Sequence, residues 1–194
     1  NFMKKIILIG AGGHATSCVD VIESTKKFKI LGFVSDSQKK NQKFLGYKIL
    51  GNLKDLKKIK LKTKNLHIGF GSIYNQKERH QIFIKLKKLG FLFPKVISPI
   101  AYVSKNSIVG EGTMIFHHAT INANVSIGKN CIINTKANIE HDCIIRDNCH
   151  ISTGAILNGN VIVDADSFVG SGSVIREGKK IKKNSFIKMG HIFK

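Results

Sequence analysis

His141 has the neighbours that a catalytic histidine needs. Glu140 precedes it and Asp142 follows it, and a carboxylate beside an imidazole can fix the ring's tautomer and stabilise its protonated form. Gly159 comes 18 residues later, where a backbone amide without a side chain could bind a developing oxyanion. The pattern fits a general base with an oxyanion donor. It also fits an exposed surface histidine, and spacing alone leaves both interpretations open.

The chain around His141 repeats with a period of six residues. An aliphatic side chain returns at Val103, Val109, Ile115, Ile121, Ile127, Ile133, Ile139, Ile145, Ile151, Leu157, Val163, Val169, Ile175, Ile181 and Ile187. Four residues after these come small or modest side chains, at Ser107, Thr113, Ala119, Val125, Cys131, Ala137, Cys143, Cys149, Ala155, Val161, Ser167, Ser173 and Ser185, with Lys179 the misfit. Inward residues at the first and fifth positions of a hexapeptide are typical of a parallel β-helix.

Three hexapeptides form one triangular coil of about 18 residues, and successive coils stack at roughly 4.8 Å. Residues 18 apart become neighbours, so the pattern predicts that Gly159 lies one coil above His141. A series of ordinary hairpins would need alternating strands and turn signals about every 8 to 12 residues, and the sequence has neither. His117 and His118 have no carboxylate neighbours, so surface or interface positions are expected, and the histidine spacings suggest no metal ligands.

A different unit precedes the repeat. Residues 5–9 read as a buried parallel strand, followed by a glycine turn, Gly10-Ala11-Gly12-Gly13, and a helix. Such a turn lets the backbone approach a phosphate and aims the helix amides at negative charge. It formally satisfies G-x-G-x-x-G/A, with Asp36 at the end of a second strand, 30–34, where a ribose-binding acid would lie. A plain tight turn is the alternative.

The remaining N-terminal elements alternate between strands and helices. We expect a loop through Gly46 and Gly51, a short helix from Asn52, a strand over 65–71, a helix from near Asn75 to Gly90, a strand over 91–97 and Pro99 at the start of the solenoid. This order predicts a small parallel α/β sheet, with a Rossmann-like domain over 3–98 and the β-helix over 99–194. Ligands of such sheets bind at the carboxyl ends of the strands, where the glycine turn, Asp36, Gly71 and Ser72 should converge.

Composition limits the class of protein. The net charge is +20, but the lysines are scattered with little aromatic interleaving, which favours a solvated surface over nucleic-acid binding and suits an anionic small substrate. The apolar run Ile6–Ile9 is too short for a signal peptide or membrane span, so a cytoplasmic protein is expected. Cys131, Cys143 and Cys149 fall in the small inward slot as free thiols.

Nearly the whole chain resembles a known family. The N-terminal IILIGAGGHA, the acid in FVSDS, the GFGS ending, VISPIAYVS at the start of the repeat and INTKANIEHDCIIRDNCHISTGAILNGNV carry the likeness. Together they resemble the bacterial sugar O-acyltransferases of the sialic-acid O-acetyltransferase type, whose near relatives N-acetylate nucleotide-linked 4-amino sugars. Two features depart from the family: Ser72 replaces a common asparagine, and SFIKMGHIFK lacks the usual glycine-x-proline-alanine-lysine close.

The resemblance implies a left-handed β-helix and a homotrimer with active sites where two solenoids meet. It implies His141 as general base and Asp142 as its supporting acid, and the 18-residue spacing adds the amide of Gly159 as oxyanion donor. His150, Gly159, Ser171 and Met189 would contact acetyl-coenzyme A. The nucleotide-linked sugar would contact Ala11, Gly12, Gly13, Asp36, Gly71, Ser72 and Asn134.

We therefore expect an acetyl-coenzyme A dependent N-acetyltransferase acting on a nucleotide-linked amino sugar, such as a UDP-4-amino-4,6-dideoxy sugar, in surface glycan assembly, without a metal. O-acetylation of a sialic-acid-like sugar is the near alternative. A zinc hydro-lyase on the same solenoid and a non-catalytic scaffold are the alternatives from other classes.

Overall fold

The computed structural model describes residues 3–71, 73 and 76–194, which fall into two compact units. The first contains residues 3–71 and Ile82–Pro94, and the second contains the described part of 73–81 and Lys95–Lys194. The boundary between residues 98 and 99 stays a prediction. No helix among the described residues is long and apolar enough to cross a membrane.

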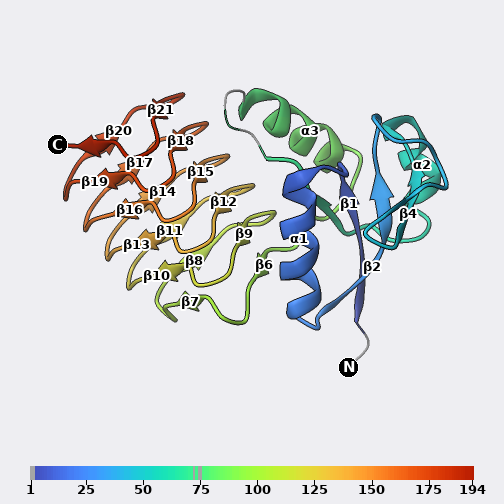
Figure 1. Ribbon diagram of the computed structural model, residues 1–194, viewed down its shortest axis with the longest axis horizontal. Coiled ribbons are helices and arrows are strands. Elements are labelled where there is room, and N and C mark those ends of the chain that lie inside the picture. The colour runs from blue at the N-terminus through green and yellow to red at the C-terminus, as the bar shows by residue number, and fades with distance from the viewer. Residues whose placement is uncertain (1–2, 72, 74–75) are drawn as a thin grey trace. The chain divides into compact units, whose positions relative to one another are not determined.

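The first unit is built on a five-stranded sheet with the order β3-β4-β2-β1-β5 (Figure 1). Its strands are β1 (Lys4–Ile9), β2 (Phe28–Val34), β3 (Lys43–Phe44), β4 (Tyr47–Gly51) and β5 (Leu66–Ile68). All adjacent pairs are parallel except β3 with β4, which confirms the predicted parallel α/β sheet. The near-continuous apolar run of β1 is typical of a strand covered on both faces, and residues 6–8 are fully buried.

The helices of this unit are α1 (Gly13–Ser24), a 3₁₀ turn η1 (Leu53–Asp55), α2 (Leu56–Ile59) and α3 (Gln76–Lys88), the last reaching into both units. The side chain of Asn52 accepts from the amide of Lys54, and Asp55 reciprocates in a capping box, so the short helix begins where expected. Gly90 follows α3 with φ +78°, as a helix-ending glycine does.

Two expectations for this unit are wrong. The segment through Gly46 is a hairpin, β3-β4, turning at Leu45 and Gly46 with positive φ, and β4 joins the sheet beside β2. Residues 91–97 do not form one strand: Leu92 makes an isolated bridge to Asn65, and the strand β6 (Val96–Ile97) pairs with the solenoid strand β9 (Met114–Ile115) instead. Pro94, which has no N–H for a ladder, separates the two pairings.

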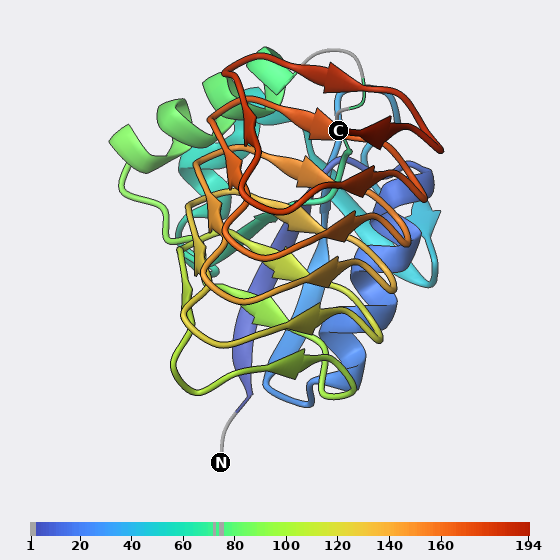
Figure 2. The same ribbon diagram turned by 90° about the vertical axis from the view of Figure 1, so that its left-hand side faces the viewer.

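The second unit is the predicted β-helix, whose coils stack in register (Figure 2). Face one consists of β6, β9, β12 (Ile132–Ile133), β15 (His150–Ile151), β18 (Phe168–Val169) and β21 (Phe186–Ile187). Face two consists of β7 (Tyr102–Val103), β10 (Thr120–Ile121), β13 (Asn138–Ile139), β16 (Ile156–Leu157), β19 (Val174–Ile175) and β22 (Ile192–Phe193). Face three consists of β8 (Ile108–Val109), β11 (Ser126–Ile127), β14 (Ile144–Ile145), β17 (Ile162–Val163) and β20 (Lys180–Ile181). Each residue pairs with the one 18 positions later, as Thr120 does with Asn138, so the predicted coil length is confirmed.

The aliphatic column fills the interior. Its members from Val109 to Ile187 are buried in one cluster, and Val103 packs against that cluster at the first coil. The three cysteines of the small slot are buried, and burial raises the pKa of the Cys131 thiol to about 12 and that of Cys143 to about 11. Their thiols donate to backbone carbonyls across the coil, Cys131 to Arg146 at 3.1 Å and Cys143 to Asn158 at 3.1 Å.

From Gly112 to Gly190, each corner of the solenoid turns through a residue in the left-handed conformation. These residues also recur every six positions, at Gly112, His118, Asn124, Asn130, Lys136, Asp142, Asn148, Gly154, Asn160, Asp166, Gly172, Gly178, Asn184 and Gly190, all with positive φ. Glycine, asparagine and aspartate tolerate this conformation best, and only His118 and Lys136 depart from that set. The corner pattern is a second hexapeptide signal, and it places Asp142 at a corner for reasons of fold alone.

Candidate active site

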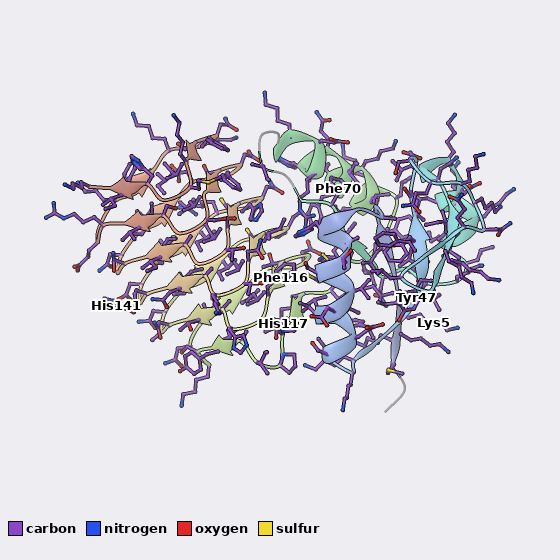
Figure 3. All side chains as sticks on the ribbon, viewed as in Figure 1. Lys5, Tyr47, Phe70, Phe116, His117 and His141 are labelled. Atoms are coloured by element: carbon purple, nitrogen blue, oxygen red, sulfur yellow. The ribbon has the colours of Figure 1, made fainter. Side chains whose placement is uncertain are left out.

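His141 and Asp142 form a pair at the corner between faces two and three, in the turn from β13 to β14. The His141 ring projects from the outer edge of its coil (Figure 3). Nδ1 of His141 lies 2.8 Å from Oδ2 of Asp142, and the two side chains are 55% and 43% exposed. When Nδ1–H donates to the carboxylate, Nε2 carries the lone pair, so the pairing sets the tautomer of a base.

Asp142 is itself held by the coil below. The side-chain amide of Asn124, 18 residues earlier, donates to its Oδ1 at 3.2 Å, and its backbone amide donates to the carbonyl of Ala123. The hydrogen bond from His141, followed by that from Asn124, lowers the pKa of Asp142. The hydrogen bond to Asp142 raises the pKa of His141, opposed by partial desolvation and helped by the negative charges of Asp142, Glu140 and Glu177. The corner therefore holds a basic imidazole against an ionised carboxylate.

Gly159 lies against the ring of His141, as the 18-residue spacing predicted. A Cβ built at position 159 would lie 2.7 Å from Cε1 and 2.8 Å from Nε2 of His141, closer than real Cβ contacts. Any other residue would displace the imidazole. Among the described residues the amide of Gly159 has no hydrogen-bond acceptor, whereas the next amide, that of Asn160, donates to the carbonyl of His141. The geometry thus places Gly159, whose backbone amide is available to donate a hydrogen bond, next to Nε2 of His141.

Glu140 is a second carboxylate beside His141, and the sequence predicted no hydrogen-bond partners for it. Its two oxygens accept hydrogen bonds from the side-chain amides of Asn122, at 2.9 Å, and Asn138, at 3.0 Å. Asn122 lies 18 residues before Glu140, just as Asn124 lies 18 before Asp142. The 18-residue spacing that paired His141 with the later Gly159 also pairs Glu140 and Asp142 with earlier residues. Counting 18 residues back from each carboxylate would have identified Asn122 and Asn124.

Of the residues expected to contact acetyl-coenzyme A, Gly159 lies at the His141 corner, whereas His150, Ser171 and Met189 lie elsewhere on the coil. His150 begins β15 on face one, is 5% exposed, and packs edge-on against the ring of Phe168 at 5.1 Å between centroids. Nδ2 of Asn134 lies 3.4 Å from Nε2 of His150. Ser171, whose hydroxyl lies 2.8 Å from that of Ser152, and the 80%-exposed Met189 sit at the corner between faces one and two.

One chain therefore divides the expected site between two corners. His141, Asp142 and Gly159 share the corner of faces two and three, and Asn134, Ser171 and Met189 share the corner of faces one and two. A whole side of the triangle, face two, separates the groups. The structure brings each group together internally and does not bring the two groups together within one solenoid.

The glycine turn of the first unit follows β1 at the carboxyl end of the sheet. Ile9 pairs with both Val34 and Ile68, so the ends of β1, β2 and β5 lie side by side. Gly10 has φ +93° and donates its amide to the carbonyl of Val34 at 2.7 Å. Among the described residues, no atom lies within 4 Å of a Cβ built at Gly12 or Gly13, so a ligand could approach the backbone of these two glycines closely.

The other predicted contacts of this unit cluster at the same edge. The side-chain amide of Gln38, which the sequence did not single out, donates to the carbonyl of Ala11 at 2.9 Å and ties the loop after β2 to the glycine turn. Oδ1 of Asp36 accepts from the amide of Leu53 at 3.1 Å. A Cβ at Gly71 would lie 3.5 Å from the ring of His14, and Ser72 lies outside the described residues.

The remaining histidines of the repeat have structural partners or face solvent. Nδ1 of His117 lies 2.7 Å from the hydroxyl of Ser98, and His118 is an exposed corner residue. Within the described part of the chain, no group of three or more His, Cys, Asp or Glu side chains is placed to hold a metal ion.

Both units of the chain are similar to known proteins. Residues 5–86 match the family model described as the PglD N-terminal domain. The acetyltransferase domain of PglB from Neisseria gonorrhoeae FA1090, in complex with acetyl coenzyme A, is 26% identical with a TM-score of 0.90, covering 100% of this chain and 92% of that one. No protein among the curated sequences matches significantly.

Two more solved structures share the fold at lower identity. WeeI from Acinetobacter baumannii AYE is 22% identical with a TM-score of 0.82, over 99% of this chain and 92% of that one. A mutant of perosamine N-acetyltransferase from Caulobacter crescentus, in complex with CoA and GDP-perosamine, is 22% identical with a TM-score of 0.71, over 96% and 91%. Residues 5–86 thus form a PglD N-terminal domain, and the chain as a whole is similar in sequence and fold to an acetyltransferase domain that was solved with acetyl coenzyme A.

Proposed function

We propose that this protein transfers the acetyl group of acetyl-coenzyme A to an amino group of a nucleotide-linked sugar during glycan assembly. The observation that carries the proposal is the His141–Asp142 pair lying against the Gly159 amide. A base with a fixed tautomer and a neighbouring donor are the two parts that acyl transfer requires.

In the proposed reaction the sugar amine attacks the thioester carbonyl while Nε2 of His141 takes the proton that the nitrogen loses. Asp142, held by Asn124, keeps Nδ1 protonated and stabilises the imidazolium that forms. The Gly159 amide donates to the carbonyl oxygen as it becomes anionic. Collapse of the tetrahedral intermediate breaks the C–S bond, and the imidazolium returns its proton to the leaving thiolate.

The donor substrate would lie along the other corner, against His150, Ser171 and Met189. Ser171 and Met189 are exposed at that corner, and His150 is held in one orientation by Asn134 and Phe168. The gonococcal PglB domain, which matches this chain along its whole length, was solved with acetyl coenzyme A, which supports the choice of donor.

The features of the first unit support a nucleotide-linked sugar as the acceptor of the acetyl group. The unobstructed backbone of Gly12 and Gly13 at the start of α1, with no acidic side chain in the first turn of the helix, suits a diphosphate. Asp36 follows β2, where a carboxylate could hydrogen-bond a ribose or the edge of a base. The net charge of +20 favours an anionic substrate. The Caulobacter enzyme, with which this chain shares its fold, was solved with GDP-perosamine, a nucleotide-linked amino sugar.

The divided site leads to the proposal of a homotrimer in which the His141 corner of one chain faces the His150 side of the next. Apolar side chains project outward on faces two and three, where a lone solenoid would expose them to water. Tyr102, Ile108 and Ile192 are 60%, 68% and 61% exposed, and Ile144, Ile156, Ile162 and Val174 are half-buried. Such faces are suited to burial between subunits.

A product assay tests the reaction. Purified protein, acetyl-coenzyme A and a panel of nucleotide-linked amino sugars should release free thiol and give a product heavier by one acetyl group, with the corresponding hydroxy sugars as controls. An N-acetyl product resists hydroxylamine, whereas an O-acetyl ester is cleaved, so the treatment separates the proposal from the sialic-acid type. Thiol release with neither sugar class would contradict the proposed function.

A mixing experiment tests the shared site. His141→Ala and His150→Ala chains, assayed at low acetyl-coenzyme A, should each be nearly inactive. After co-refolding in equal amounts, about one interface in four would combine two intact sides, so about a quarter of wild-type activity should return. A site contained in one chain cannot be restored this way, and the absence of recovery in mixed trimers would rule out the shared arrangement.

A further inference from the structure

The edge of the sheet opposite the glycine turn is lined with lysines. Strands β1, β2 and β5 are parallel, so their beginnings lie at one edge, which we call the amino-end edge (Figure 1). The exposed lysines there are Lys4, Lys5, Lys26, Lys27, Lys62 and Lys64. Backbone contacts hold the three segments together, since the amide of Lys4 donates to the carbonyl of Lys27, and the carbonyl of Lys5 (Figure 3) accepts from Thr63 and Asn65.

Large apolar side chains stand among these lysines. Leu61, between Lys60 and Lys62, is 90% exposed, and Met3, before Lys4, is 52% exposed. Leu92 is also 52% exposed, and its amide donates to the carbonyl of Lys64. Lys60 is not counted among these lysines, because its ammonium donates to the carbonyl of Leu89 and lies over the Phe91 ring, 5.7 Å from the ring centroid. The amino-end edge therefore combines positive charge with protruding aliphatic groups.

Little negative charge offsets these lysines. From Leu56 to Lys77 the sequence has no Asp or Glu, and Glu23, in the last turn of α1, accepts the hydroxyl hydrogen of Tyr47 at 2.5 Å. Lysines commonly cluster at helix C-termini, where they offset the helix dipole. That explanation does not extend to Lys4 and Lys5 on β1 or to Lys64 in the segment before β5.

We infer that the amino-end edge binds the surface of an anionic lipid bilayer. Clustered lysines attract acidic headgroups, and aliphatic side chains beside them can enter the boundary between headgroups and acyl chains. Single-stranded nucleic acid would instead need exposed aromatic rings for stacking, and the exposed apolar residues at this edge are Met3, Leu61 and Leu92. The glycine turn lies at the opposite ends of the same strands, so a lipid-bound sheet keeps it open to solvent.

Vesicle co-sedimentation tests the inference independently of any acetyl transfer. The full chain should sediment with vesicles of equal parts phosphatidylcholine and phosphatidylglycerol at low salt, stay in solution with phosphatidylcholine alone, and be released progressively by added salt. Each lysine near an anionic surface contributes about fivefold in partitioning, so Lys62→Glu with Lys64→Glu should weaken binding by about 25-fold or more. Lys105→Glu with Lys182→Glu, two exposed solenoid lysines, gives the same change in net charge and should bind as the wild type does.

Leu61→Ser keeps every charge and removes the apolar protrusion, so it should weaken binding to the anionic vesicles without altering the midpoint of thermal unfolding. This variant also keeps the test decisive if the double lysine variant fails to fold. Equal losses in the edge and solenoid variants would show a general charge effect and overturn the inference. So would wild-type binding in Leu61→Ser, or retention on single-stranded RNA with none on anionic vesicles.

Discussion

Gly159→Ala is the smallest change that tests whether His141 acts in catalysis. A Cβ at position 159 would lie 2.7 Å from Cε1 of the ring, and ordinary contact begins at 3.4 Å, so the ring would have to retreat by about 0.7 Å to restore ordinary contact. The side chain of His141 is 55% exposed and has room to move. Other coils carry Ala123 and Glu177 at the equivalent position, so the backbone there accepts a side chain.

The expected loss follows from that displacement. Misplacing a catalytic group by about 1 Å can lower a rate about 100-fold, so Gly159→Ala should lower kcat by about 30- to 100-fold with little change in either KM. His141→Ala, which removes the general base, should lower kcat by about two to four orders of magnitude. Both variants should keep the wild-type unfolding midpoint, because neither changes the buried column of the solenoid.

The assay is a double-mutant cycle on thiol release at saturating substrates. If the added methyl group acts only by moving the imidazole, Gly159→Ala has no further effect in the His141→Ala background. An equal loss in both backgrounds would mean that the substitution harms the amide donor or the coil rather than the base. Full activity of Gly159→Ala in the wild-type background would refute the proposed geometry outright.

Three further outcomes follow from the structure. Asp142→Asn removes the interaction that raises the pKa of His141, so the acid limb of the kcat/KM profile should move to lower pH. An unchanged acid limb would mean that this limb does not report the titration of His141. Asp36→Ala should weaken nucleotide-sugar binding in calorimetry and leave coenzyme A binding unchanged, and parallel losses would contradict separate contacts. Inserting one residue after Asn130 shifts the register of every later hexapeptide, so circular dichroism should show loss of the cooperative unfolding transition.

The solenoid could be predicted from sequence because its signal is repeated and local. One aliphatic side chain every six residues fixes which side chains point inward, and a coil of 18 residues then fixes which residues are neighbours. The contact of Gly159 with His141 follows from that arithmetic alone. The same subtraction leads from Asp142 to Asn124 and from Glu140 to Asn122, so the supporting contacts of the site were accessible to the same reasoning.

The first unit was less predictable because its departures depend on tertiary pairing. Strand β3 has two residues, too few for any periodic pattern, and it is defined by its pairing with β4. Phe91, Phe93 and Val96 are buried and suggest a strand, but they face different partners on either side of Pro94. Apolar residues predict which positions are buried. A strand also needs a neighbouring segment to hydrogen-bond with, and the sequence of 91–97 does not indicate which segment that is.

At Asp142 the demands of fold and chemistry coincide, which decides how the residue should be tested. The corner requires positive φ, here 61°, and glycine, asparagine and aspartate all accept it. Of these three only aspartate supplies the charge that Nδ1 of His141 meets at 2.8 Å. Asp142→Ala would mix loss of that charge with a conformational cost of about 1 to 2 kcal/mol for an L-residue in the left-handed region. Asp142→Asn keeps the corner and removes the charge, so a change in its pH profile reports the altered partner of His141 rather than a strained turn.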